Sequence, residues 1–235
     1  MDKILILLLF VSSSMLGQTN SSIDKFKQLS ASIRLGIWDS ENSDTGIKID
    51  RVSYEEIPKT IDFRGTVVEC LKWTDSLGEN LLIQSVSGHF LVNEEESDDK
   101  WELYAYLFRK GKDETAYKKV WRMYDYNLCF GVDWYAGFIP HATTITDIDG
   151  NGITEVSIPY VLICRGGVDP GTMKIIMYEG NNKYAVRGKT MILCDSEYAE
   201  GGAYTVSENL KGKPDFKSFL IRRWDIHKCE DDSFY

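Results

Sequence analysis

The sequence predicts a mainly β fold, either an antiparallel sheet or sandwich or a set of propeller-like hairpins, with one α-helix near the C-terminus. Two observations carry this prediction. Short apolar stretches alternate with turns rich in Gly, Asn and Asp over residues 46–194, as expected of consecutive antiparallel strands. After residue 213 the apolar residues recur every three or four positions, which is typical of an amphipathic helix. We expect one domain over residues 46–229.

The N-terminus has the pattern of a cleaved export signal. A short segment with Lys3 precedes an apolar run over residues 4–11, and small residues follow up to Gly17. The run is far shorter than the ~20 residues needed to span a bilayer. We therefore expect cleavage between Gly17 and Gln18 and export to the periplasm, the outer surface or the medium, not a transmembrane protein. The alternative is a buried N-terminal strand.

The predicted strands come from apolar runs in chain order. Residues 18–45 are expected to form an N-terminal arm, and the alternating run 47–52 starts the sheet. Hairpins are predicted where two runs flank a turn: 66–73 with 81–86, 101–109 with 117–126, and 174–179 with 183–188. Residues 191–194 could add a strand, whereas 133–138 and 198–202 are expected to be loops.

The aromatic strand at residues 101–109 carries different side chains on its two faces. They are Leu103, Ala105 and Leu107 on one face, and Tyr104, Tyr106 and Phe108 on the other. Because aromatic side chains bury large areas, we expect a strand covered on both faces. The alternative is a platform on which sugars stack.

The C-terminal helix is expected over residues 214–227. Pro214 suits the first helical position and Asp215 suits the first turn. The expected apolar face, which would cover the sheet, consists of Phe216, Phe219, Leu220, Ile221 and Trp224. Residues 230–235 form an acidic tail that is expected to be frayed.

Five cysteines are present, and no C-x-x-C motif occurs. An exported chain can hold disulfides. Cys129 and Cys164 flank the acidic loop described next, which makes them the first expected pair; Cys194 with Cys229 is the second. One cysteine, Cys70 in this pairing, is left over, and the spacing alone leaves the pairing open.

The one chemically specific motif is the acidic loop at residues 147–155, DIDGNGITE. Calcium takes six to eight oxygen ligands from carboxylates, amides, carbonyls and water. Alternate residues of the loop can direct their oxygens at one point, and Gly152 permits the sharp turn. The expected ligands are Asp147, Asp149, Asn151, the carbonyl of Ile153, and Glu155.

The spacing distinguishes this loop from an EF-hand. Its first six residues match D-x-[DN]-x-[DN]-G, but position twelve is Ile158 and the acid comes at position nine, Glu155. The loop resembles the D-x-D-x-N-G-x-x-E/D loops between strands of integrin-type FG-GAP repeats. A polar turn without a metal is the alternative. A bound ion would brace the loop rather than catalyse a reaction.

Three segments, 73–80, 146–156 and 169–188, together resemble a family of exported proteins of Gram-negative bacteria that is labelled surface polysaccharide biosynthesis protein. The family has no defined activity, and the resemblance covers most of residues 60–228. It implies an envelope role and places Asp147, Asp149, Asn151 and Glu155 on the family's acidic loop. The family more often has an acid near the position of Gly167.

The composition disfavours nucleic acid as a partner, because phosphate binding needs a basic face and the net charge is −9. No G-x-S-x-G, H-E-x-x-H, P-loop or dinucleotide motif occurs. A polysaccharide hydrolase would need paired carboxylates, for which Asp133, Glu155 and Asp169 are candidates.

Two further kinds of residue bear on the enzyme hypothesis. His141 could orient a carboxylate, and Arg165 and Arg187 could hold an anionic sugar. We expect a secreted or envelope protein without catalysis, with a calcium-binding loop, linked to surface polysaccharide or adhesion and binding a glycan or an envelope protein. The alternative is an enzyme acting on cell-surface polysaccharide. The oligomeric state is left open.

Overall fold

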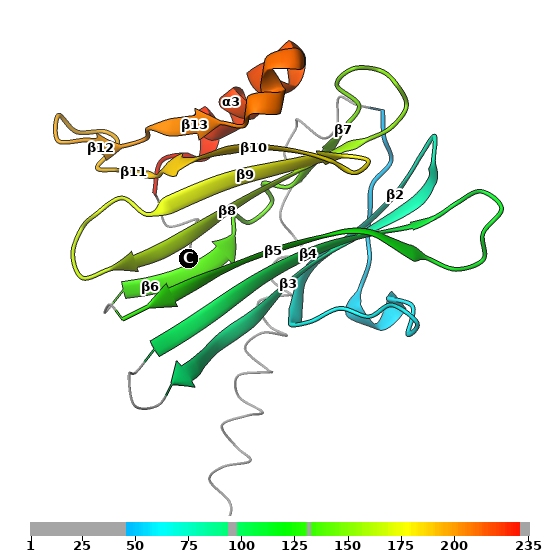
Figure 1. Cartoon of the computed structure of the whole chain (residues 1–235), viewed down its shortest axis with the longest axis horizontal. Helices are drawn as coiled ribbons and strands as arrows, with labels where there is room; N and C mark the ends of the chain where they lie inside the picture. Colours follow the sequence, from blue (N-terminus) through cyan, green and yellow to red (C-terminus); the bar gives the residue numbers. More distant parts are fainter. Residues whose placement is uncertain (1–45, 94–97, 131–132, 231–235) are drawn as a thin grey trace, which may run out of the picture. The chain divides into compact units, whose positions relative to one another are not determined.

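The computed structural model describes residues 46–93, 98–130 and 133–230, which form two antiparallel sheets and a C-terminal helix (Figure 1). The mainly β fold is confirmed. The expected export signal, the arm at residues 18–45 and the tail beyond residue 230 lie outside the described residues. No helix in the described ranges is long and apolar enough to cross a membrane.

The first sheet has the strand order β1-β2-β3-β4-β5, and each strand is antiparallel to the next. Its strands are β1 (Asp50–Arg51), β2 (Thr66–Asp75), β3 (Gly78–Asn93), β4 (Asp98–Lys110) and β5 (Lys118–Cys129). A 3-10 turn, η2 (Tyr54–Glu56), follows β1. Two of the predicted hairpins, β2–β3 and β4–β5, are confirmed, while the run at 47–52 contributes only the two residues of β1.

The second sheet has the order β13-β10-β9-β8-β6, and β7 pairs with β8 beside β6. Its strands are β6 (Asp133–Phe138), β7 (Thr144–Thr146), β8 (Glu155–Arg165), β9 (Thr172–Glu179), β10 (Asn182–Lys189) and β13 (Tyr204–Val206). The short strands β11 (Met191–Ile192) and β12 (Glu200–Gly201) pair with each other, so part of the expected loop at 198–202 is a strand. The 3-10 turn η3 (Glu208–Gly212) leads into α3 (Pro214–His227).

The loop expected at residues 133–138 is wrong, because this segment is strand β6. β8 is 11 residues long. One part of its edge pairs with β6, from Asp133 opposite Arg165 onward, and the rest pairs with β7. Gly137 lies inside this strand, where a Cβ would overlap the ring of Tyr135. Glycine inside a strand often marks such a close approach.

The two sheets pack face to face around the main core. It takes Leu71, Trp73, Leu82, Leu107 and Met123 from the first sheet, and Ile145, Val156, Ile158, Ile176 and Tyr178 from the second. Trp121 of β5 stacks on Tyr178 of β9, with ring centroids 4.2 Å apart. The alternating apolar residues of each strand therefore form a sandwich, one of the predicted alternatives.

The outer face of each sheet is also covered. α3 packs on the outer face of the second sheet, on the side away from the first sheet (Figure 1). The segment with Ile57 and Ile61 packs against Tyr104, Tyr106 and Phe108 of β4. The prediction of a strand covered on both faces is confirmed for this part of β4.

The helix spans the predicted residues, with Pro214 at its start. Its buried face differs by one residue: Arg223 is fully buried, and Ile221 is only partly buried. The guanidinium Nη2 of Arg223 donates a hydrogen bond of 2.7 Å to the carbonyl of Ala142. A buried polar group of this kind needs such a partner, and the apolar pattern alone did not predict it.

Two disulfides, Cys129–Cys164 and Cys194–Cys229, form the expected pairs, and Cys70 is buried and free. The expected reason for the first pair was incomplete. Cys129 belongs to β5 and Cys164 to β8, so this bond joins the two sheets and does not close the acidic hairpin.

Glu230 is anchored, which corrects the expectation of a frayed tail at this residue. Its carboxylate accepts hydrogen bonds from the Gly171 amide at 2.9 Å and from the hydroxyl of Thr190. Its other oxygen lies 2.9 Å from Nη1 of Arg165. Arg165 is thus bound to the C-terminal segment in an ion pair.

Candidate metal centre

The acidic loop connects β7 to β8, as predicted, and the pair Thr146 and Glu155 closes the hairpin. Gly150 and Gly152 have φ values of 69° and 80°. Other residues adopt this left-handed region at a steric cost, so the two glycines permit the tight path of the loop.

Side-chain oxygens hold the loop in shape. Oδ2 of Asp147 accepts a hydrogen bond from the Gly152 amide at 3.0 Å. Oδ1 of Asn151 accepts one from the Ile153 amide at 2.7 Å. Oε2 of Glu155 accepts one from the Ile148 amide at 2.8 Å. The backbone amides therefore point toward these side-chain oxygens, which turns the side chains inward.

Three carboxylates converge inside the loop. Asp147, Asp149 and Glu155 each offer one oxygen, and these oxygens lie within 4.8 Å of one another. Glu155 is fully buried, Asp147 is partly buried and Asp149 is exposed. Three negative groups this close repel one another unless a positive charge lies among them.

Two of the buried oxygens in this cluster have no hydrogen-bond partner in the described structure: Oδ1 of Asp147 and Oε1 of Glu155. Burial raises the pKa of Glu155 to about 7, against the opposing hydrogen bonds from Ile148 and Thr146. The charge of Asp149 contributes to this rise in the pKa of Glu155. Buried polar atoms are nearly always satisfied. The residues present therefore fit a hard cation bound among the three acids.

A fourth acid, Glu179, and a lysine, Lys213, lie beside the cluster. Nζ of Lys213, at the start of α3, is 3.0 Å from Oδ2 of Asp149 and 3.5 Å from Oε2 of Glu179. Nδ2 of Asn151 donates to Oε1 of Glu179 at 2.8 Å. The loop is thereby tied to the end of β9 and to the helix, and one ammonium group partly balances its charge.

The loop also contacts the first sheet through the β2–β3 turn. The amide of Ser76 donates to the carbonyl of Gly152 at 2.8 Å. The hydroxyl of Thr154 donates to Oδ2 of Asp75 at 2.9 Å and accepts from Nε1 of Trp73 at 2.8 Å. The loop is therefore a junction of both sheets and the helix.

The structure brings together three of the five predicted ligands, namely the three acids. Asn151 and Ile153 belong to the same loop and hydrogen bond to each other. Sequence reasoning missed Glu179 and Lys213, because nothing local marks either residue. Glu179 precedes a hairpin turn and Lys213 precedes a helix, and only the tertiary fold places them beside the loop.

The three acids named for a hydrolase do not meet at one place, because Glu155 lies apart from the other two. Asp133 lies opposite Arg165 at the far end of β8 from Glu155. Ten residues of strand separate these two ends, about 33 Å at the usual rise per residue. Asp169 is on the Arg165 side, because Nη1 of Arg165 donates to its carbonyl at 2.6 Å. Glu155 therefore cannot form the carboxylate pair of a glycosidase with Asp133 or with Asp169.

His141 does not orient a carboxylate in this structure. Its Nδ1 lies 2.9 Å from Nη2 of Arg51, which can only donate, so Nδ1 accepts. Burial lowers the pKa of His141, and the charge of Arg51 lowers it further. The side chain of His89 lies outside the described part of the structure.

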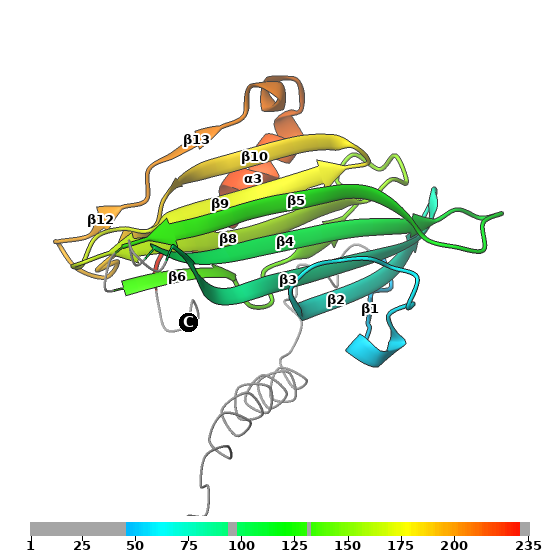
Figure 2. The same ribbon diagram turned by 60° about the horizontal axis from the view of Figure 1, so that its bottom comes forward.

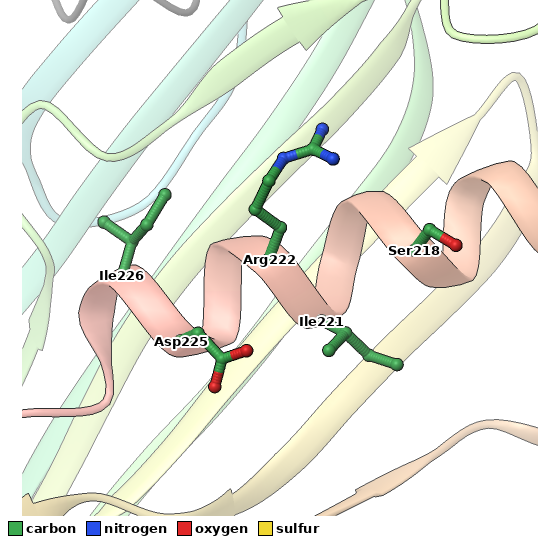
Figure 3. Close-up of a pocket in the computed structure, with 5 residues that line it drawn as sticks. All are labelled: Ser218, Ile221, Arg222, Asp225 and Ile226. Atoms are coloured by element: carbon green, nitrogen blue, oxygen red, sulfur yellow. The ribbon is translucent and has the colours of Figure 1, made fainter.

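A depression on the outer side of α3 is lined by Ser218, Ile221, Arg222, Asp225 and Ile226 (Figure 3). All five residues belong to the helix, and Ile226 is half exposed. One element alone forms this surface, so it is a shallow region between side chains and not a cleft for a reaction.

Comparison with known proteins gives no family: no family model, no curated protein and no solved structure matches the chain.

Proposed function

We propose that the chain is an exported binding domain without catalytic activity, and that its 147–155 loop holds one calcium ion that braces the β-sandwich. The observation that carries this proposal is the pair of buried, unpartnered oxygens on Asp147 and Glu155, which face a third acid. A cation between them would relieve both the repulsion and the missing interactions.

The chemistry of the donors favours calcium over other metals. The predicted set consists of carboxylate, amide and carbonyl oxygens, the ligands of hard cations. Zinc and copper sites use histidine or cysteine, and no such side chain belongs to this cluster. Calcium also tolerates irregular geometry and shared water, whereas magnesium demands a near-ideal octahedron.

The expected role of the ion is mechanical. The loop contacts the β2–β3 turn through Gly152, the end of β9 through Asn151, and the start of α3 through Asp149. An ion that fixes the loop would therefore fix three elements relative to one another. It would stabilise the fold by binding only the folded state.

Export and an envelope role belong to the same proposal. The signal-like N-terminus supports them, and two disulfides are typical of proteins that fold in an oxidising compartment. We propose a glycan or an envelope protein as the partner, in a role linked to surface polysaccharide or adhesion. The alternative, an enzyme acting on cell-surface polysaccharide, would need a carboxylate pair that does not include Glu155, which lies apart from Asp133 and Asp169.

The proposal is tested by thermal unfolding of the protein with calcium, with magnesium and with chelator. At a hundredfold excess over its Kd, calcium should add about 2.7 kcal/mol to the free energy of unfolding. For a domain of this size we expect the midpoint to rise by roughly 5–10 °C. Magnesium should have a smaller effect.

Three variants make the experiment specific. Asp147→Asn and Glu155→Gln keep the size of each side chain and should abolish the calcium effect. Asp133→Asn removes an exposed acid outside the loop and should keep the full effect. If calcium leaves the midpoint of the unaltered protein unchanged, or if Asp133→Asn loses the effect equally, bracing by this loop is wrong.

A further inference from the structure

Three cations lie together on the second sheet, on the face that looks toward the first sheet. They are Lys174 of β9 and Lys183 and Arg187 of β10. Their strand neighbours on this face, Ile176 and Ala185, belong to the main core. β5 is the last strand of the first sheet, and the second sheet continues past it through β9, β10 and β13 (Figure 2). Lys183 and Arg187 are exposed along this border.

The register places like charges against each other. Arg187 lies directly opposite Lys174 in the β9–β10 pair, and Lys183 follows on the same face of β10. Like charges in directly opposed positions destabilise a sheet. The whole chain carries a net charge of −9, so this local concentration of positive charge runs against the composition.

One carboxylate, that of Asp125 in β5, forms an ion pair with one of these cations, Lys174. Its Oδ2 lies 2.6 Å from Nζ of Lys174 and also accepts a hydrogen bond of 2.6 Å from the hydroxyl of Tyr160. Among the residues that the structure describes, no carboxylate forms an ion pair with Lys183 or Arg187. These two side chains are therefore left with charge that an external ligand can neutralise.

The surroundings of Lys183 agree with this view. Lys183 is exposed but partly desolvated by its neighbours, which lowers its pKa; the charges of Arg187 and Lys174 lower this pKa further, and the charge of Asp125 opposes them. Its Nζ lies 5.9 Å from the ring centroid of Tyr178, which offers a weak cation–π contact and no counter-charge. A bound anion would supply the charge that is absent here.

We propose that Lys183 and Arg187, with Lys174 beside them, bind an acidic polysaccharide through its carboxylate groups. The proposal rests on the role of the chain as an exported binding domain and names its class of ligand. Lys183 and Arg187 are four residues apart on one strand, about 13 Å at the usual rise. Two separated cations suit a chain that repeats its acidic groups better than a single small anion.

The balance of charge also argues against nucleic acid. Nucleic acid needs many phosphate contacts over a broad basic surface, and an acidic protein with three clustered cations would repel the remainder of a dense polyanion. A polysaccharide with one carboxylate per sugar or per few sugars carries a lower charge density. Arginine and lysine both bind such carboxylates, and arginine does so with two parallel hydrogen bonds.

The test uses polygalacturonate as the probe and dextran as a neutral comparison, with binding measured by calorimetry at low salt. The variant Lys183→Gln/Arg187→Gln should bind polygalacturonate at least tenfold more weakly than the unaltered protein. The control Lys211→Gln/Lys217→Gln removes the same charge from exposed positions near α3 and should stay within twofold. Dextran should bind neither protein measurably.

Five outcomes would overturn the proposal. They are no binding of polygalacturonate, equal weakening in both double variants, equal binding of dextran, equally tight binding of polyglutamate, and competition by millimolar inorganic phosphate at equal strength. Binding of polyglutamate would indicate an acidic protein partner, and competition by phosphate would indicate an adventitious anion site. The double variant should unfold at or above the midpoint of the unaltered protein, because it removes like-charge repulsion. Binding in chelator separates this test from that of the calcium loop, whose acids are untouched.

Discussion

Replacement of Glu69 with glutamine should stabilise the protein above pH 7. Glu69 belongs to β2, and its Oε2 accepts a hydrogen bond of 3.1 Å from Nε2 of Gln84. Burial raises its pKa from 4.5 to about 7, while the charge of Arg51, 3.8 Å away, and a hydrogen bond with Thr143 oppose the rise. Between pH 4.5 and 7 the folded state therefore keeps a proton on Glu69 that the unfolded state has lost.

The sign and size follow from this difference. Because the folded pKa is raised, the stability linked to this proton is complete below pH 4.5 and is lost as the pH rises through 7. A rise of this size corresponds to about 3 kcal/mol at 1.36 kcal/mol per pKa unit. Glutamine has no charge to bury, so Glu69→Gln should raise the free energy of unfolding at pH 8. The expected gain is about 2–3 kcal/mol, because the variant also loses the attraction to Arg51.

Urea unfolding at pH 4 and pH 8 measures this effect. The two proteins should have similar free energies of unfolding at pH 4, and the variant should be the more stable at pH 8. A variant less stable than the unaltered protein at pH 8 would refute the reasoning, because it would mean that Arg51 more than compensates the buried charge.

The remaining predictions concern other charges and one disulfide. Burial disfavours the charge on Glu102, but hydrogen bonds from Lys100, Tyr104 and Tyr124 lower its pKa to about 2, so its stabilisation is complete above pH 4.5 and is lost as the pH falls toward 2. Glu102→Gln should therefore cost about 2–3 kcal/mol at pH 7 in urea unfolding, and an unchanged stability at pH 7 would refute this. The double variant Cys129→Ala/Cys164→Ala opens a loop with a separation of 35 residues and should lower the free energy of unfolding by about 3.8 kcal/mol at 25 °C. A loss below about 1 kcal/mol in urea unfolding would contradict this prediction. Glu230→Ala removes the ion pair with Arg165 and the acceptor for Gly171 and Thr190, so it should lower the free energy of unfolding by about 1–3 kcal/mol; a thermal midpoint equal to that of the unaltered protein would mean that the C-terminal anchor is unimportant. Lys213→Met removes a positive charge 3.0 Å from Asp149 and should tighten calcium binding several-fold, whereas weaker binding would show that Lys213 supports the site.

Much of the fold could be predicted because its signals are local. Alternating runs that flank a turn predicted the β2–β3, β4–β5 and β9–β10 hairpins, and Pro214 marked the start of α3. Strand β6 was missed because Gly137 interrupts the strand pattern of its sequence, although the segment pairs with residues 160–165 of β8. The burial of Arg223 was missed because its partner, Ala142, is distant in sequence.

The candidate site likewise has one part that the sequence predicts and another part that only the tertiary fold brings together. Asp147, Asp149 and Glu155 could be named from the sequence because one short loop carries all three. The contacts that make this loop a junction come from Asp75, Glu179 and Lys213, which only the sheet topology brings near. The cations at Lys174 and Arg187 likewise meet only through the register of β9 and β10.

The central claim, a calcium ion in the 147–155 loop, is tested most directly by calorimetric titration of the chelator-treated protein with calcium. One ion should bind per chain, and Asp147→Asn should abolish binding while Asp133→Asn preserves it. A flat titration, or binding of equal strength in Asp147→Asn, would contradict the account.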